Sequence, residues 1–191
     1  AVIPDRIEAG TFLIAAAAIG EKVEVTNIIP EHLESVVQCL KKANVNIEVS
    51  DNSIIVQSDN RNISSTNIET NEYPGFPTDL QAQWMMLMCL ANGTSTIKEN
   101  IYYDRFTHIM ELNRLGCNIK LEDSIAIIEG DRSLIGADVM STDIRASAAL
   151  IIAALCAKGT TKISRVYHID RGYDKIEEKL TNIGAEIFRK K

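Results

Sequence analysis

The chain contains one sequence unit three times, about 65 to 75 residues apart. Each copy opens with an apolar run that closes on a glycine, the residue expected just past the end of a helix. The three runs are DRIEAGTFLIAAAAIG, PTDLQAQWMMLMCLANG and STDIRASAALIIAALCAKG, which close at Gly20, Gly93 and Gly159. An internal repeat constrains the fold more than a single motif does, because every copy has to build the same supersecondary unit.

The residues after each glycine predict the rest of the unit. Alternating Val, Ile and Thr indicate a strand in KVEVTNI, TSTIKENI and TTKISRVYHI. An amphipathic helix follows, with apolar residues three and four positions apart, and then another strand in NIEVS, NIKLE and AEIFR. Copies one and two add a further strand across the polar turns Asp51-Asn52 and Glu122-Asp123. The unit is therefore helix, strand, helix, strand, strand.

The first helix of each unit is apolar on nearly every side, so it has to be buried. Three such helices are expected to lie together beneath sheets and outer helices. We therefore predict a single α/β domain, residues 1–191, with approximate threefold internal symmetry. Its units cover about residues 4–57, 77–130 and 141–191, and two polar linkers, 58–77 and 130–141, join them.

Composition excludes several functions. A formal net charge of −6 argues against sequence-independent binding of nucleic acid, although a few local arginines can still attract a small anion. The longest apolar runs are shorter than the roughly 18 residues that span a bilayer, so no membrane segment is expected. The cysteines show no metal-ligand spacing, and we interpret them as reduced structural thiols of a cytoplasmic protein: Cys39, Cys89, Cys117 and Cys156. The sequence indicates no metal and no cofactor.

Residues that differ between equivalent positions of the three copies indicate where function, rather than the shared fold, determines the residue. The position just before each buried helix holds Arg6, Asp79 and Asp143, and two residues later stand Glu8, Gln81 and Arg145. An aspartate at a helix start can serve as a cap alone, and the residues themselves leave that interpretation open for Asp79 and Asp143. Arg145 differs, because a cation in the first turn opposes the helix dipole unless an anion binds there.

A second set of equivalent positions lies twelve residues after each closing glycine, at the expected start of the amphipathic helix: His32, Arg105 and Arg171. Salt bridges to the adjacent Asp104 and Asp170 are one explanation for the arginines. The other is that the repeat brings the helix starts to one edge, where Arg105, Arg145 and Arg171 surround a phosphate or carboxylate. Asp79 and Asp143 could then accept a proton from a bound hydroxyl.

Four separated strings carry a resemblance to a known family: PGFPTDLQAQ, DRFTHIMEL, STDIRASAALI and YHIDRGYDKIEEKLTNIGAEI. Together they resemble the C-terminal half of the UDP-N-acetylglucosamine 1-carboxyvinyltransferase family, a branch of the enolpyruvyl transferases. The resemblance runs from about Pro4 to Arg189. It implies an inside-out α/β domain of three units, and a second, N-terminal domain absent from this chain that closes over the substrates. The chain also lacks an initiator methionine, which suggests a piece of a longer protein.

The resemblance implies roles for six residues. Asp79 matches an aspartate that contacts the sugar nucleotide and is proposed as the base for its 3-hydroxyl, and the backbone of Ile101 contacts the same sugar. Arg105, Arg145 and Arg171 match the arginines that hold phosphoenolpyruvate, with Arg171 also counted as catalytic. Asp143 matches an active-site aspartate that handles protons. The sequence does not rank Asp79 against Asp143 as the base.

The activity implied is transfer of the enolpyruvyl group from phosphoenolpyruvate to UDP-N-acetylglucosamine with loss of phosphate, a step of peptidoglycan and cell-wall synthesis. The fragment alone is expected to be inactive, because the family's reactive cysteine loop belongs to the other domain. Tyr73 and the pair Tyr103-Asp104 depart from the family's usual His and Glu-Asn. Two alternatives remain: the shikimate-pathway enolpyruvyl transferase, and a non-catalytic threefold scaffold that binds proteins.

Overall fold

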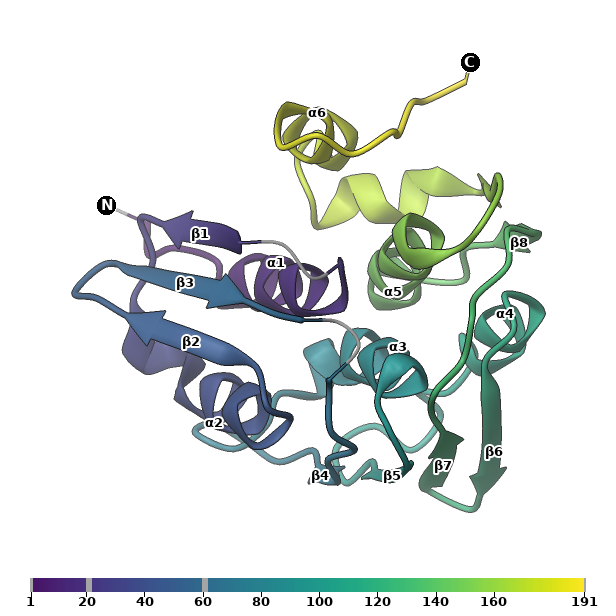
Figure 1. Cartoon of the computed structure of the whole chain (residues 1–191), viewed down its shortest axis with the longest axis horizontal. Helices are drawn as coiled ribbons and strands as arrows, with labels where there is room; N and C mark the ends of the chain where they lie inside the picture. The colour runs from purple at the N-terminus through teal and green to yellow at the C-terminus, as the bar shows by residue number, and fades with distance from the viewer. Residues whose placement is uncertain (1, 20–21, 60–61, 191) are drawn as a thin grey trace.

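Three apolar helices lie side by side at the centre of the computed structural model, which describes residues 2–19, 22–59 and 62–190 (Figure 1). They are α1 (Arg6–Ile19), α3 (Gln81–Leu90) and α5 (Ile144–Cys156), and each contacts the other two. Every residue of α3 from Gln81 to Cys89 is buried. The prediction of three buried central helices is therefore confirmed.

The closing glycines that the structure describes lie in the turns after these helices, but the helices already end at the extended residues Ala91 and Ala157. Gly93 and Gly159 have φ angles of 99° and 92°, in the left-handed region that a residue without Cβ adopts at low cost. Each stands three residues beyond the last helical residue, Leu90 or Cys156. Gly20, the equivalent residue of the first copy, lies outside the described residues.

Three small sheets surround the central helices. The first is antiparallel with the order β1-β3-β2, and the second has the order β4-β5-β7-β6. The third pairs β8 with β9 in parallel. The strands are β1 (Lys22–Thr26), β2 (Asn46–Val49), β3 (Ser53–Gln57), β4 (Ile68–Glu69), β5 (Thr94–Lys98), β6 (Asn118–Glu122), β7 (Ile125–Glu129), β8 (Asp138–Met140) and β9 (Lys162–Ser164).

Shorter helices pack outside the central three. The amphipathic helices are α2 (Glu34–Lys42), α4 (Ile109–Arg114) and α6 (Ile176–Asn182), and 3-10 turns stand at η1 (Pro30–Leu33), η2 (Thr78–Leu80) and η3 (Val166–Arg171). The apolar face predicted for the first copy is buried, with Leu33, Val36 and Leu40 at most 1% exposed. A separate small cluster, which includes Ile169, Tyr173, Ile176 and Leu180, packs the last unit against α5.

The structure corrects the sequence prediction in two places. The segment AEIFR, residues 185–189, forms no strand. In the other units the equivalent strand pairs with a hairpin partner, β3 or β7, and the last unit has no such partner within the described ranges. The two segments predicted as polar linkers also contain strands, β4 and β8. β4 pairs in parallel with β5, and β8 pairs in parallel with β9. The central helix between the two strands of each pair, α3 or α5, provides the crossover connection that parallel strands need.

Candidate functional site

Two of the predicted arginines meet on one aspartate. Arg105 Nη1 lies 2.5 Å from Asp79 Oδ1, and Arg145 Nη2 lies 3.2 Å from Asp79 Oδ2. Asp79 belongs to η2, Arg105 to the turn before α4, and Arg145 to the first turn of α5. The three side chains are between 20% and 35% exposed, so the cluster is partly shielded from water yet reachable by a ligand.

The charged groups in this cluster shift one another's pKa values. Burial on its own raises the pKa of Asp79, but hydrogen bonds and charges from Arg105 and Arg145 outweigh burial and hold that pKa below its ordinary value. Burial also opposes the charged form of Arg145, and Asp79 and Tyr173 overcome it, so the pKa of Arg145 is raised. The site therefore contains one carboxylate and two fixed cations, an arrangement that carries net positive charge and can accept an anion.

Asp143 has a structural task that Asp79 lacks. Its Oδ1 accepts hydrogen bonds from the backbone N–H groups of Arg145 at 2.8 Å and Ala146 at 2.9 Å, and so caps α5. Its Oδ2 accepts from the hydroxyls of Thr107 and Thr142, both at 3.4 Å. The capping interpretation is thus confirmed for Asp143. It is wrong for Asp79, whose side chain makes no cap hydrogen bond at η2.

The first copy needs a different alignment. Asp5 Oδ1 accepts from the N–H groups of Ile7 at 2.7 Å and Glu8 at 3.3 Å, which is the cap geometry of Asp143 at α5. Asp5, rather than Arg6, is therefore the counterpart of Asp143 as a helix cap. The sequence comparison was one residue out of register at the first copy.

Arg171 stands apart from the ion-paired cluster. It ends η3 and is exposed, and its side chain forms no hydrogen bond or ion pair with any residue of the described ranges. The following residue, Gly172, comes so close to α5 that an added Cβ would lie 2.8 Å from Ile144 Cγ2 and 3.8 Å from Arg145 Nη1. The chain at 171–172 therefore borders Arg145, and the Arg171 guanidinium is a cation without a protein partner in the described structure.

Two sequence expectations about the arginines change. Arg105 and Arg171 precede α4 and α6 by four and five residues, so the prediction that they occupy the first turns of these helices is wrong. Ile101 is 42% exposed, and its N–H donates to Glu99 Oε1 at 2.9 Å. A ligand can therefore reach Ile101 through its carbonyl oxygen, which accepts no hydrogen bond from the part of the chain described here.

A buried polar network that the sequence did not predict lies behind Arg145. The hydroxyl of Tyr173, a residue 1% exposed, lies 2.8 Å from Thr11 Oγ1 and also bonds to Arg145. Gln83 Nε2 donates to Thr11 Oγ1 at 3.0 Å and to the carbonyl of Asp79 at 3.2 Å. The network joins α1, α3 and α5 near their N-terminal ends. In the sequence, only Thr11 and Gln83 indicate this network, because they are polar residues within apolar helices.

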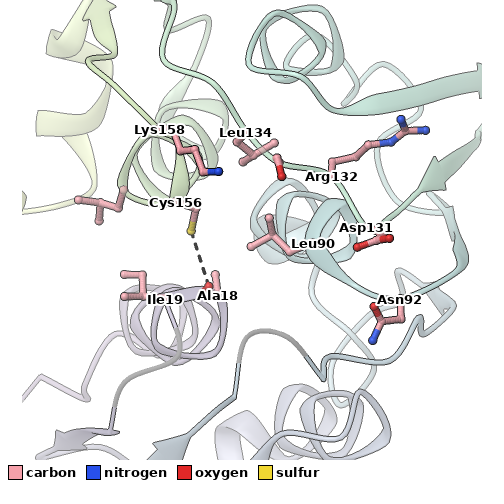
Figure 2. Close-up of a pocket in the computed structure, with 11 residues that line it drawn as sticks. Ala18, Ile19, Leu90, Asn92, Asp131, Arg132, Leu134, Cys156 and Lys158 are labelled. Carbon is pink, nitrogen blue, oxygen red and sulfur yellow. Dashed lines mark hydrogen bonds between the residues drawn. The ribbon is translucent and has the colours of Figure 1, made fainter.

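A cavity lies at the other end of the central helices. It measures about 530 Å³ and is lined by Ala18, Leu90 and Cys156, near the C-terminal ends of α1, α3 and α5 (Figure 2). Burial raises the pKa of the Cys156 thiol to about 12, so this cysteine is protonated near neutral pH and a poor nucleophile. Figure 2 shows its sulfur directed toward the carbonyl of Ala18. The chemistry predicted from the sequence lies at the opposite end.

The described residues contain neither a cluster of three or more His, Cys, Asp or Glu side chains arranged for a metal ion nor a helix long and apolar enough to cross a bilayer.

Comparison with known proteins finds relatives that match nearly the whole chain. The family model of EPSP synthase (3-phosphoshikimate 1-carboxyvinyltransferase) matches residues 1–180. Proteins named UDP-N-acetylglucosamine 1-carboxyvinyltransferase are similar: that of Campylobacter fetus is 54% identical over 188 residues and that of Chlorobium luteolum 52% identical over 187. Each alignment covers 98% of this chain, and the chain spans 44% of each relative's length.

Solved structures share the fold. The enolpyruvyl transferase NikO from Streptomyces tendae superimposes with a TM-score of 0.90 at 26% identity, over 97% of this chain and 44% of that one. EPSP synthase from Acinetobacter baumannii gives a TM-score of 0.74 at 14% identity, over 99% of this chain and 44% of that one. The second likeness shows the α/β fold alone.

Proposed function

This chain belongs to the EPSP synthase family, and from that membership we propose that its protein transfers the enolpyruvyl group of phosphoenolpyruvate to the 3-hydroxyl of UDP-N-acetylglucosamine, with release of phosphate. The observation that carries the proposal is the meeting of Arg105 and Arg145 on Asp79. The names of the relatives at about 52% identity support the sugar nucleotide as the acceptor.

The proposed binding step exchanges one anion for another. Asp79 pairs with both Arg105 and Arg145 and offsets part of their charge. The phosphate and carboxylate of phosphoenolpyruvate offer these arginines bidentate partners, and Arg171 adds a third cation from the bordering segment. Fixed cations would then stabilise the tetrahedral intermediate that forms when the sugar oxygen adds to C2 of phosphoenolpyruvate and a proton adds to C3. Loss of phosphate from C2 together with a proton from C3 would restore the double bond in the product.

The same exchange would prepare Asp79 as the base. Arg105 and Arg145 hold its pKa down, so their transfer to the substrate would raise that pKa and make the carboxylate a better proton acceptor. Asp143 already uses both oxygens, one as the cap of α5. We therefore assign the base to Asp79, and to Asp143 the placement of Arg145. The carbonyl of Ile101 is the group we assign to the sugar.

The proposal includes a second domain. The chain spans less than half of its relatives' length, and we propose that it is one domain of three units, near residues 4–57, 77–130 and 141–191. The remaining part of the protein would close over the site and exclude water. On this account the isolated fragment is inactive. The complete enzyme would act in the cytoplasm, in peptidoglycan precursor synthesis, and would use no metal or other cofactor.

The experiment that tests the proposed function is phosphate release by the full-length protein of the parent gene. With phosphoenolpyruvate and UDP-N-acetylglucosamine we expect turnover, and Arg145→Ala should lower kcat/KM by about 100-fold or more, because a fixed cation at the developing charge is lost. Arg114→Ala is the matched control, since Arg114 is 60% exposed on α4 and pairs only with Glu111.

Three results would contradict the proposed function. One is an unchanged kcat/KM in Arg145→Ala. Another is phosphate release with shikimate 3-phosphate in place of UDP-N-acetylglucosamine, which would assign the enzyme to the other branch. Absence of turnover with either acceptor would favour the non-catalytic scaffold.

A further inference from the structure

Glu99 is a fully buried carboxylate that the proposed chemistry does not use. It follows β5 and is 0% exposed. Its Oε1 accepts three hydrogen bonds, from the hydroxyl of Thr70 at 2.7 Å and from the backbone N–H groups of Ile101 at 2.9 Å and Tyr102 at 3.0 Å. Burial of a carboxylate costs free energy unless hydrogen bonds compensate it. The three hydrogen bonds to Oε1 therefore hold their donor groups in place.

One side of this arrangement leads to Arg105. The carbonyl of Tyr102 accepts from the Arg105 N–H at 3.0 Å, and the Arg105 guanidinium lies 5.5 Å from the centre of the Tyr102 ring. Gln81 Nε2 also donates to the carbonyl of Arg105, at 3.3 Å. The turn that presents Arg105 is therefore built on Tyr102, whose N–H is bound to Glu99.

The other side leads to Asp79. Thr70 donates its hydroxyl to Glu99 and accepts the N–H of Asn100 at 2.9 Å on the same oxygen. It also forms a bridge with Phe76, and the Asn71 N–H donates to the Phe76 carbonyl at 2.9 Å. Phe76 stands three residues before Asp79. Glu99 thus joins the two segments that carry the members of the Asp79–Arg105 pair.

We propose that Glu99 is a positioning residue that locks the turn bearing Ile101 and Arg105 onto the segment bearing Asp79. The inference rests on the proposed function and deepens it, because it names what fixes the two groups for the anionic substrate. Glu99 touches no substrate on this account. A displacement of about 1 Å in a binding group is enough to lower catalysis by about 100-fold, so the lock would affect turnover without taking part in it.

The first test of the lock does not depend on the reaction. In full-length protein, Glu99→Ala should speed amide hydrogen exchange at residues 101 and 102 by at least about 10-fold, while exchange in β6 and β7 stays unchanged. Glu99→Gln should retain most of the protection, because its carbonyl still accepts at Oε1 and its amide replaces an oxygen that has no partner in the described structure. Glu122→Ala, at the exposed end of β6 in the same sheet, is the control.

The second test is a double-mutant cycle on kcat/KM for phosphoenolpyruvate. Glu99→Ala should lower kcat/KM by about 10- to 100-fold, and Glu99→Gln should recover most of it. In the Arg105→Ala background the Glu99 substitution should add less than about threefold, because its effect passes through Arg105. A purely structural role would instead give additive losses.

The outcomes separate this inference from the proposed function. Unchanged exchange at residues 101 and 102 in Glu99→Ala overturns the lock, and so does an additive cycle. A protein that shows the exchange effect but does not turn over phosphoenolpyruvate with either acceptor contradicts the proposed function and leaves the lock supported. If Glu99→Ala does not fold, the Glu99→Gln variant in the same cycle decides, because a kcat/KM as low as that of Arg105→Ala would contradict the expected rescue.

Discussion

At the scale of single residues, Asp79 combines two tasks that need opposite environments. Its ion pairs with Arg105 and Arg145 lower its pKa, whereas a base needs a higher one. Substrate binding would resolve this conflict by removing its cations. On the proposed function, Asp79 would occupy the anion's place beside the arginines before binding and accept the proton afterwards.

The pH dependence of stability tests the first of these tasks. A lowered folded-state pKa gives a stabilisation that is present above the unfolded pKa and is lost as pH falls through the folded pKa. Asp79→Asn should therefore unfold at a lower temperature than the parent at pH 7, and the difference should shrink below about pH 4. Thermal unfolding of the full-length protein at a series of pH values measures this.

The control for that series is Asp123→Asn, on the exposed turn between β6 and β7. Its difference from the parent should be small and should not vary with pH. An Asp79→Asn difference that is equally independent of pH would show that Asp79 gains nothing from its arginines.

Comparison of the three copies identified Asp79, Arg105 and Arg145, because each is a charged residue at a position where the copies do not all have the same residue. It could not find Tyr173 or Glu99. Tyr173 meets Thr11 across 162 positions of sequence, and Glu99 meets Thr70 across 29. Such contacts depend on how the units pack, and a single sequence carries no periodic signal for them.

At the scale of elements, the start of α5 links helix stability to the site. Asp143 caps the helix, and the first turn of the helix carries Arg145. Asp143→Ala should cost about 0.5–2 kcal/mol of unfolding free energy and displace Arg145. Asp143→Ser keeps an acceptor for the cap, so it should restore stability and most of the kcat/KM. Denaturant unfolding and phosphate release measure the two effects, and a stable but inactive Ser variant would return the proton-handling role to Asp143.

The sequence predicted helices and strands correctly where their pattern of apolar residues extended over several residues. The apolar run of α1, 14 residues long, and the alternating strands of the hairpins in units one and two gave clear signals. β4 and β8 have only two and three residues, too few for any alternation to show. The last segment, AEIFR, has the alternation of a strand and no partner to pair with, because strand formation depends on a neighbouring strand as well as on local pattern.

At the scale of the whole molecule, the packing of the three central helices explains why Asp79, Arg105 and Arg145 meet at one end. α1, α3 and α5 contact one another with their N-terminal turns joined by the Tyr173 network and their C-terminal ends around the cavity of Figure 2. Residues at equivalent helix starts therefore converge. One unit supplies Asp79 and Arg105, and the next supplies Arg145 and Arg171. The remaining surface of this end is what the proposed second domain would cover.

The central claim is that these residues hold phosphoenolpyruvate. A crystal structure of the full-length protein with phosphoenolpyruvate and UDP-N-acetylglucosamine tests it most directly. We predict the phosphate and carboxylate of phosphoenolpyruvate within hydrogen-bond distance of Arg105, Arg145 and Arg171, with Asp79 released from its arginines and next to the sugar 3-hydroxyl. Phosphoenolpyruvate bound elsewhere, with Asp79 still paired to Arg105 and Arg145, would contradict the account.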